Sequence, residues 1–345
     1  MATAWFVLLG FMLIVYVVLD GFDLGAGILH LGLARDDRER RTVLAAIGPV
    51  WDGNEVWLIA SGGLLVFAFP RVYAVAFSGF YLPLMLVLWL IVLRGLAIEL
   101  RSHHANPLWR QLFDVVFAGS STVLALVLGV ALGNVLRGVP IGSDGYFAAP
   151  LFASFTTSGE LGALDWYTLS VGAFAVVVLA AHGAMFLRWK TAGELAARAT
   201  RLARRLWIAV AICAVAVTIE TAIVRPELVD ALVGRPGLWI LPVLAASAIV
   251  VALVALARGW ELRGFLASAL AIASLLGLSA GAIYPVILRS TLDPGYSLYV
   301  ATSANEAHGL AIGLAWWIPA VSLAIGYFAY LFRSIRGKAE AGEHE

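Results

Sequence analysis

Long apolar segments recur through the whole chain and limit what it can fold into. Each is long enough to cross about 30 Å of hydrocarbon as a helix, which takes about 20 residues. The segments are continuous and rich in Leu, Ala and Val, whereas membrane β-barrel strands alternate polar and apolar residues. The sequence therefore predicts an all-α polytopic membrane protein with nine transmembrane helices. The expected spans are residues 5–33, 48–69, 72–98, 113–136, 165–188, 206–225, 237–257, 264–288 and 308–332.

Composition supports a membrane location. Hydrophobic residues make up 62% of the 345 and charged residues only 13%, whereas soluble domains are about a quarter charged. The net charge of +1 argues against nucleic acid, which requires a basic surface. The single cysteine, Cys213, excludes an intramolecular disulfide and a Cys-cluster metal site. Because the first basic residue is Arg35, no cleavable signal peptide is evident, and we expect the first span to remain as an anchor.

The basic residues of the connections predict the orientation. Cytoplasmic loops of membrane proteins are enriched in Lys and Arg. Eighteen basic residues fall on one side and five on the other, alternating loop by loop. This predicts an outer N-terminus and a cytoplasmic C-terminus. The five outer residues are Arg71, Arg137, Arg225, Arg235 and Arg289.

A weak internal repeat predicts how the spans are grouped. Residues 17–21 read VVLDG and residues 178–183 read VLAAHG, four spans apart, which suggests two parallel four-helix units and one peripheral helix. Leu195, Leu202 and five basic residues suggest an amphipathic helix on the inner interface at residues 191–205, although a plain positive-inside loop would explain the same charges. The polar tail, residues 338–345, is expected to be disordered. The predicted regions are a first four-helix unit (1–136), an ordered outer loop (137–164), a second four-helix unit (165–288) with its cytoplasmic segment (190–206), and an outer connection, ninth helix and tail (289–345).

Acidic residues inside the first two spans are the strongest functional candidates, because burying charge in a bilayer costs several kcal/mol. Asp20 and Asp23 are three residues apart, as are Asp52 and Glu55, so each pair shares one helix face. Both pairs lie about 16–18 Å from the inner charge cluster at 1.5 Å per residue. Four neighbouring carboxylates in a low dielectric cannot all be ionised, and such a group suits proton transfer. The alternative is that they cap or pair locally beside helix distortions at the two Asp-Gly pairs, at Gly21 and Gly53.

Other polar and aromatic residues are weaker candidates. A haem iron needs a His or Met ligand, but His30, His182 and His308 form no paired-ligand pattern, so we expect no haem or metal on this chain. The glycines at positions 21, 25 and 27 form a small-residue face suited to close helix packing. The residues expected to support the proton path or pack against another subunit are Trp51, Asn54, Trp57 and Arg101.

Four motifs carry a resemblance to a known family. Leu19–Gly27 reads LDGFDLGAG, Ile47–Ser61 reads IGPVWDGNEVWLIAS, Pro70–Tyr81 reads PRVYAVAFSGFY, and Gly133–Pro140 reads GNVLRGVP. Together they resemble subunit II of the cytochrome bd-type quinol oxidases. The resemblance is strong over residues 5–140; the connection and ninth span at the end of the chain depart from the family's polar pattern.

The resemblance implies a function in a prokaryotic cytoplasmic membrane. Subunit I of such oxidases carries two b-type haems and one d-type haem and the quinol site, and subunit II is its pseudo-symmetric partner without haem ligands. The complex oxidises quinol, reduces dioxygen to water and takes the protons from the cytoplasm. Asp52 matches a family position on a cytoplasmic proton path, with Asp23 as a companion. The resemblance also allows a structural quinone in this chain, membrane-lipid contacts and a small accessory transmembrane subunit, without requiring them.

Two other functions fit the residues apart from the motifs. A proton-coupled secondary transporter would also have many spans, a faint repeat and buried carboxylates. A purely structural scaffold subunit would need the acids only for packing. A second, haem-bearing subunit in the purified complex would distinguish the oxidase from the transporter, and Asp52→Asn would distinguish a proton path from a scaffold.

Overall fold

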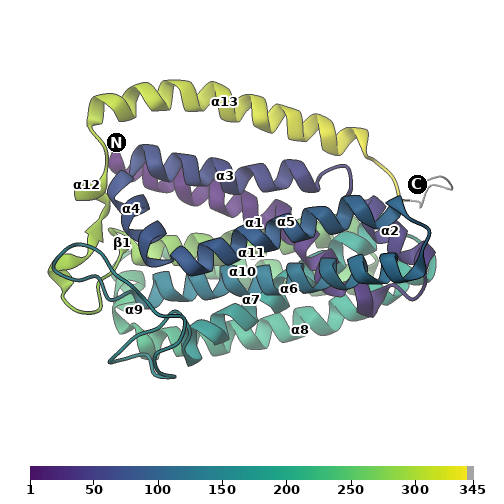
Figure 1. The fold of residues 1–345 in the computed structure, drawn as a ribbon, viewed down its shortest axis with the longest axis horizontal. Coiled ribbons are helices and arrows are strands. Elements are labelled where there is room, and N and C mark those ends of the chain that lie inside the picture. Colours follow the sequence, from purple (N-terminus) through teal and green to yellow (C-terminus); the bar gives the residue numbers. More distant parts are fainter. Residues whose placement is uncertain (340–345) are drawn as a thin grey trace.

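The computed structural model describes residues 1–339 as an elongated bundle of long helices (Figure 1). The predicted disordered tail, residues 338–345, falls almost wholly outside these residues. In chain order, the elements are α1 (Ala2–Leu33), α2 (Asp37–Ile47), α3 (Trp51–Ala68), α4 (Pro70–Gly79), α5 (Tyr81–Leu100), α6 (Pro107–Arg137), α7 (Trp166–Lys190), α8 (Gly193–Val224), α9 (Pro226–Val233), α10 (Ile240–Arg258), α11 (Glu261–Ile283), β1 (Val286–Leu288), β2 (Leu298–Tyr299), α12 (Val300–Ser303) and α13 (Ala307–Ser334), with 3₁₀ turns at Arg101–His103, Pro236–Trp239 and Pro294–Tyr296.

The prediction of an all-α polytopic membrane protein is confirmed. Within residues 1–339, eight helices are long and apolar enough to cross a membrane. The predicted second span is also helical, as α3, but it is not one of the eight. Its first five residues include Asp52, Asn54 and Glu55, and these polar groups lower its mean hydropathy. The helix richest in candidate residues is thus the one predicted helix that is not among the eight.

The boundaries of several predicted spans differ from the structure. The expected span at 72–98 is two helices, α4 and α5, separated at Phe80. Helix α2 was not predicted, although the side chain of Asp36 caps it by accepting a hydrogen bond from the Glu39 amide at 2.9 Å. The predicted interfacial helix at 191–205 is helical, but it forms the first turns of the continuous helix α8 rather than a separate element. Its apolar residues Leu195 and Leu202 pack into the hydrophobic core of the bundle.

Short elements gather at the end of the bundle that holds the N-terminus (Figure 1). The predicted span at 264–288 ends at Ile283, and the following residues form the β1–β2 hairpin, in which Val286 pairs with Tyr299 in antiparallel register. The loop between α6 and α7 is held against this hairpin, since the Val139 amide donates to Arg289 O at 2.9 Å and its carbonyl accepts from Thr291 N at 3.0 Å. The hairpin and the loop therefore form one ordered cap.

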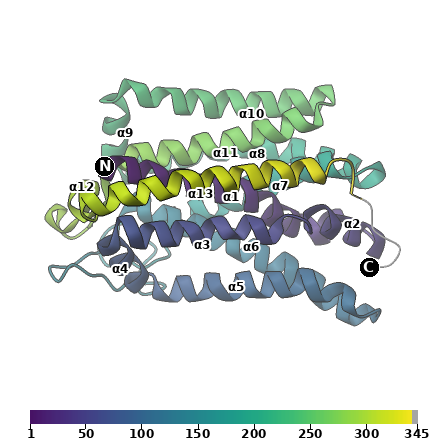
Figure 2. The same cartoon turned by 90° about the horizontal axis from the view of Figure 1, so that it is seen from above.

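Helix α1 lies at the centre and contacts α3, α6, α7 and α11 (Figure 2). The two segments of the weak repeat lie against each other in this core. A Cβ on Gly25 would lie 2.7 Å from the Cα of Gly183, so the α1 and α7 backbones approach as closely as two glycines allow. His182 adds a hydrogen bond from its ring to Val18 O at 3.0 Å. The predicted small-residue face of helix 1 is thus a packing face.

Candidate functional site

One buried arginine joins two of the candidate carboxylates. Arg94 of α5 donates from Nη2 to Asp20 Oδ1 of α1 at 2.5 Å and to Glu55 Oε1 of α3 at 2.6 Å. The side chains of Arg94 and Asp20 are 0% and 1% exposed, and that of Glu55 is 14% exposed. Three helices distant in sequence therefore meet at one ionic group, which we call the Arg94 cluster: Arg94, Asp20, Glu55, Asp23 and Asn54.

Asp23 and Asn54 complete this cluster one turn further along α1. Asn54 donates from its side-chain amide to Asp23 Oδ2 at 2.7 Å and to Leu19 O at 3.3 Å. Both side chains are fully buried. Asp23 has no cation within ion-pair distance among residues 1–339. It is therefore a buried carboxyl group held by an amide alone.

The cluster has one cation for three carboxyl groups. A buried charge without a partner costs far more than a neutral group, so this arrangement is cheapest when it holds protons. Several of its polar atoms have no hydrogen-bond partner among the described residues, namely Asp20 Oδ2, Asp23 Oδ1, Asn54 Oδ1 and Arg94 Nε and Nη1. The cluster thus has polar atoms left with which to hydrogen-bond further polar groups.

Asp52, the first-choice residue of the proton-path prediction, lies outside the cluster. It is exposed on the first turn of α3 and has no ion pair or side-chain hydrogen bond within the described part of the chain. The buried face of α3 instead follows Asn54, Trp57 and Ser61. The arrangement therefore differs from two facing acid pairs: Glu55 and Asp20 share Arg94, and Asp52 is exposed outside the cluster.

The two candidate tryptophans pack against different helices. Trp57 is buried, and its ring lies 5.8 Å from that of Phe328 on α13. Trp51 is half-buried beside α5, where a Cβ on Gly95 would lie 3.3 Å from its ring. Both therefore fix the position of α3, the helix that carries Asp52 and Glu55.

Arg101 belongs to a second ionic group, near the end of the bundle where the C-terminal residues lie. Asp114 of α6 accepts from Arg101 Nε at 2.5 Å, from His30 Nε2 at 2.6 Å and from Arg40 Nη1 at 2.8 Å. Asp37 accepts from Arg101 Nη2 at 2.9 Å and from a further arginine, Arg110. A cavity of about 420 Å³ adjoins these groups. This group ties together α1, α2, α6 and the 3₁₀ turn that follows α5.

The three candidate histidines, His30, His182 and His308, lie on three different helices. His182 uses both ring nitrogens, with Ser268 Oγ at 2.6 Å and Val18 O at 3.0 Å. His30 contacts Asp114, and His308 is exposed. The described residues contain no group of three or more His, Cys, Asp or Glu side chains arranged to hold a metal ion. These three histidines of the described chain are therefore not arranged as a pair of haem ligands.

Sequence reasoning missed Arg94 and Asp114 as site residues. Arg94 was counted among the basic residues of a cytoplasmic connection, although it lies inside the predicted span 72–98. The rule that flagged the acids, that an ionisable group within a span is costly, applies equally to this arginine. Asp114 also lies inside a predicted span and could have been found in the same way.

The fold and these groups define a class: a multi-pass membrane protein whose central helices bury an ionic cluster. The family profile described as "Cytochrome bd terminal oxidase subunit II" matches residues 1–335. The chain belongs to this family, as the motifs predicted, and is a multi-pass protein of the bacterial cytoplasmic membrane. The match includes the ninth predicted span, where the motif resemblance was weakest.

Individual relatives agree with this assignment. The chain is 30% identical to "Cytochrome bd-I ubiquinol oxidase subunit 2" of Escherichia coli (strain K12), with 93% of this chain and 90% of that protein aligned. It is 32% identical to "Probable cytochrome oxidase subunit 2" of Haemophilus influenzae, with 98% and 94% aligned. A chain of the solved bd oxidase from Geobacillus thermodenitrificans has the same fold, with a TM-score of 0.73, 20% identity and coverage of 96% of this chain and 97% of that one.

Proposed function

We propose that this chain is the non-haem subunit of a quinol oxidase that reduces dioxygen to water, and that it carries part of the cytoplasmic proton path. Haems b and d would be bound by subunit I, the partner in a heterodimeric core, and quinol and dioxygen would be substrates of the complex. The observation that carries the proposal is the Arg94 cluster, three carboxyl groups with one cation, in a chain of the bd oxidase family. A structural quinone and a small accessory subunit remain expectations of the resemblance.

We infer nine membrane crossings, with the N-terminus outside. The termini of the described chain lie at opposite ends of the bundle (Figure 1), which requires an odd number of crossings. The eight apolar helices together with α3 supply nine. The end toward which α2 and the 3₁₀ turn Arg101–His103 lie carries most of the basic connections, so it would face the cytoplasm. With nine crossings, the proposed grouping is two units of four helices each, with α13 as the ninth helix.

The proposed path runs from exposed to buried carboxyl groups. Asp52 is exposed, Glu55 is 14% exposed and Asp20 is 1% exposed. Asp52 and Glu55 are three residues apart on α3 and so share a face, and Arg94 bridges Glu55 to Asp20. Asp23 would hold a proton beyond them, with ordered water joining the unpartnered oxygens. We therefore place Asp52, which the motif assigned to the proton path, at the entrance of the proposed route.

The test is proton-coupled turnover of the affinity-purified complex. A reduced-minus-oxidised spectrum should contain haem bands from a second subunit, and a colourless chain that moves a solute by itself would instead support the transporter. Glu55→Gln should then slow quinol-driven oxygen consumption and proton uptake while the haem content is retained. Glu99→Gln, which changes an exposed carboxylate at the end of α5, is the matched control. Wild-type turnover in Glu55→Gln would favour the scaffold alternative.

A further inference from the structure

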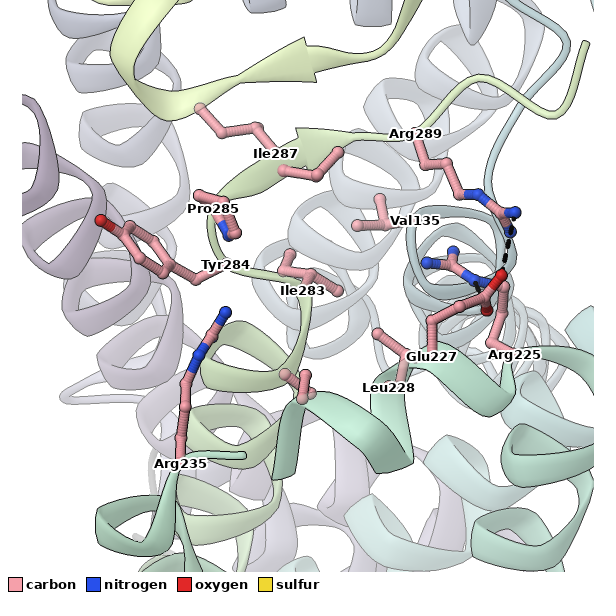
Figure 3. Close-up of a pocket in the computed structure, with 13 residues that line it drawn as sticks. Val135, Arg225, Glu227, Leu228, Arg235, Ile283, Tyr284, Pro285, Ile287 and Arg289 are labelled. Atoms are coloured by element: carbon pink, nitrogen blue, oxygen red, sulfur yellow. Dashed lines mark hydrogen bonds and ion pairs between the residues drawn. The ribbon is translucent and has the colours of Figure 1, made fainter. Parts of the chain in front are cut away.

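A cavity with three arginines lies where several spans end, beside the β1–β2 hairpin (Figure 3). Its volume is about 200 Å³. Val135 of the last turn of α6 lines it, Ile283 is the final residue of α11, and Arg225 directly follows α8. Because three long apolar helices end around it, the cavity lies at the depth of the lipid headgroups.

The charge of the cavity is predominantly positive. Arg225 and Arg289 both reach Glu227, at 3.2 Å and 3.3 Å. Burial acts to raise the pKa of Glu227, but hydrogen bonds from its own backbone and from Arg225, with the nearby charge of Arg289, hold it below its ordinary value. The ionised carboxylate therefore cancels one of three positive charges. Arg235 has no ion pair within residues 1–339.

The three arginines differ in how many of their N–H donors are already used in hydrogen bonds within the protein. Arg225 is nearly buried and donates from Nη1 to Leu136 O at 2.7 Å and to Arg137 O at 3.2 Å, so it also closes the end of α6. Arg235 donates to Gly281 O at 3.1 Å and lies over the ring of Tyr284. Each guanidinium has five N–H donors, and Arg235 and Arg289 use one each in these contacts. Both can therefore donate to an anion.

The remaining wall of the cavity is apolar. Figure 3 shows Arg235 on one side, Arg225 and Arg289 with Glu227 on the other, and Val135, Ile283 and Ile287 between them. At about 30 Å³ for a water molecule, a volume of about 200 Å³ holds a headgroup phosphate but not an acyl chain. Apolar chains would continue along α9, where Val233 is 65% exposed.

We propose that this cavity binds the phosphate of an acidic phospholipid, with Arg235 and Arg289 as its principal donors. The combination of positive charge, an apolar wall and a position at the membrane boundary is the one that basic pockets between transmembrane helices use for lipid headgroups. Inorganic phosphate is also an anion, but it has no apolar part that would contact the apolar wall. The lipid would tie α9 to α11 and the hairpin.

The experiment is native mass spectrometry of the delipidated complex, titrated with phosphatidylglycerol or phosphatidylcholine. The test variants are Arg235→Gln, which breaks no ion pair of the described residues, and the double variant Arg235→Gln/Arg289→Gln. Arg71→Gln is the matched control, since Arg71 is an exposed arginine at the same end of the bundle and outside the cavity. Retained haem bands show that each complex has assembled.

We expect wild type and Arg71→Gln to bind one phosphatidylglycerol about tenfold more tightly than phosphatidylcholine, a difference of about 1.4 kcal/mol. Arg235→Gln should lose part of this preference and the double variant all of it. An excess of inorganic phosphate should leave the bound lipid in place. Displacement by inorganic phosphate would assign the cavity to the free anion and overturn the lipid proposal. Undiminished preference in the double variant would overturn the site itself.

Discussion

Arg94 Nη2 lies 2.5 Å from Asp20 Oδ1, and both side chains are buried. The same nitrogen also bonds Glu55, so a single guanidinium compensates carboxylates from two other helices. Such a bond is charge-assisted and stronger than a neutral one. The pairing explains how the first three predicted spans can carry ionisable groups and still pack together in a bilayer.

Removing that guanidinium charge should destabilise the chain. In Arg94→Gln the carboxylates of Asp20 and Glu55 lose their cation, and breaking a buried ion pair costs about 3–5 kcal/mol. The measurement is the thermal unfolding midpoint of the purified complex, with the yield of the assembled complex as a second readout. Arg71→Gln, an exposed change, should leave both at wild-type values. Equal stability of the two variants would contradict the ionic role given to Arg94.

The contact between α1 and α7 predicts an intolerance to small increases in side-chain size. A Cβ on Gly25 would overlap the carbonyl oxygen of Leu179 and lie 2.7 Å from Gly183 Cα, so Gly25→Ala must push two helices apart. Overpacking costs about 1–3 kcal/mol. The overlapping atoms belong to the backbone, so they cannot relieve the overlap by changing rotamer as a side chain can. Gly32→Ala is the control on the same helix, because nothing lies within 4 Å of that position. The thermal unfolding midpoint should fall in Gly25→Ala and stay at the wild-type value in Gly32→Ala. An unchanged midpoint in Gly25→Ala would refute the close packing.

The Asp114 group should hold the loops at its end of the bundle together. Asp114→Asn removes the charge that Arg101, Arg40 and His30 share, which leaves Arg101 with Asp37 as its remaining ion-pair partner and takes away the Arg40 ion pair. Amide hydrogen exchange should rise in α2 and in the 3₁₀ turn after α5, while the cores of α1 and α7 remain protected. Glu99→Gln, at an exposed acid nearby in sequence, should leave exchange unaltered. Wild-type protection of α2 in Asp114→Asn would remove the support for this role.

The fold could be predicted from the sequence where the bilayer imposes the constraint. A segment crossing hydrocarbon must satisfy its backbone hydrogen bonds as a helix or within a closed barrel, and long continuous apolar runs fit the helix, so these runs indicated the helices directly. The hairpin could not be predicted in this way, because Val286–Leu288 is as apolar as the preceding span and forms a strand only through its pairing with Leu298–Tyr299. The break at Phe80 likewise depends on packing, since the surrounding residues continue the apolar pattern.

The candidate site was predicted in its residue types but not in its pairings. Cost of burial alone identified Asp20, Asp23 and Glu55. The exposure of Asp52 depends on the rotation of α3, which is fixed when Asn54 and Trp57 become buried, and a helix rotation is a property of the packed bundle. Arg94 could have been identified, because it interrupts an apolar span by itself.

The central claim, that the Arg94 cluster takes up protons for dioxygen reduction, is tested most directly with Asp20→Asn. The asparagine can still accept from Arg94, and Arg94 keeps Glu55 as a counter-charge, so the complex should assemble with its haems. The measurement is quinol-driven oxygen consumption together with proton uptake in reconstituted vesicles, with the haem spectrum recorded on the same sample. We expect both rates to fall about tenfold or more while quinol still reduces the haems. Wild-type oxygen consumption and proton uptake in a fully haem-loaded Asp20→Asn complex would contradict it.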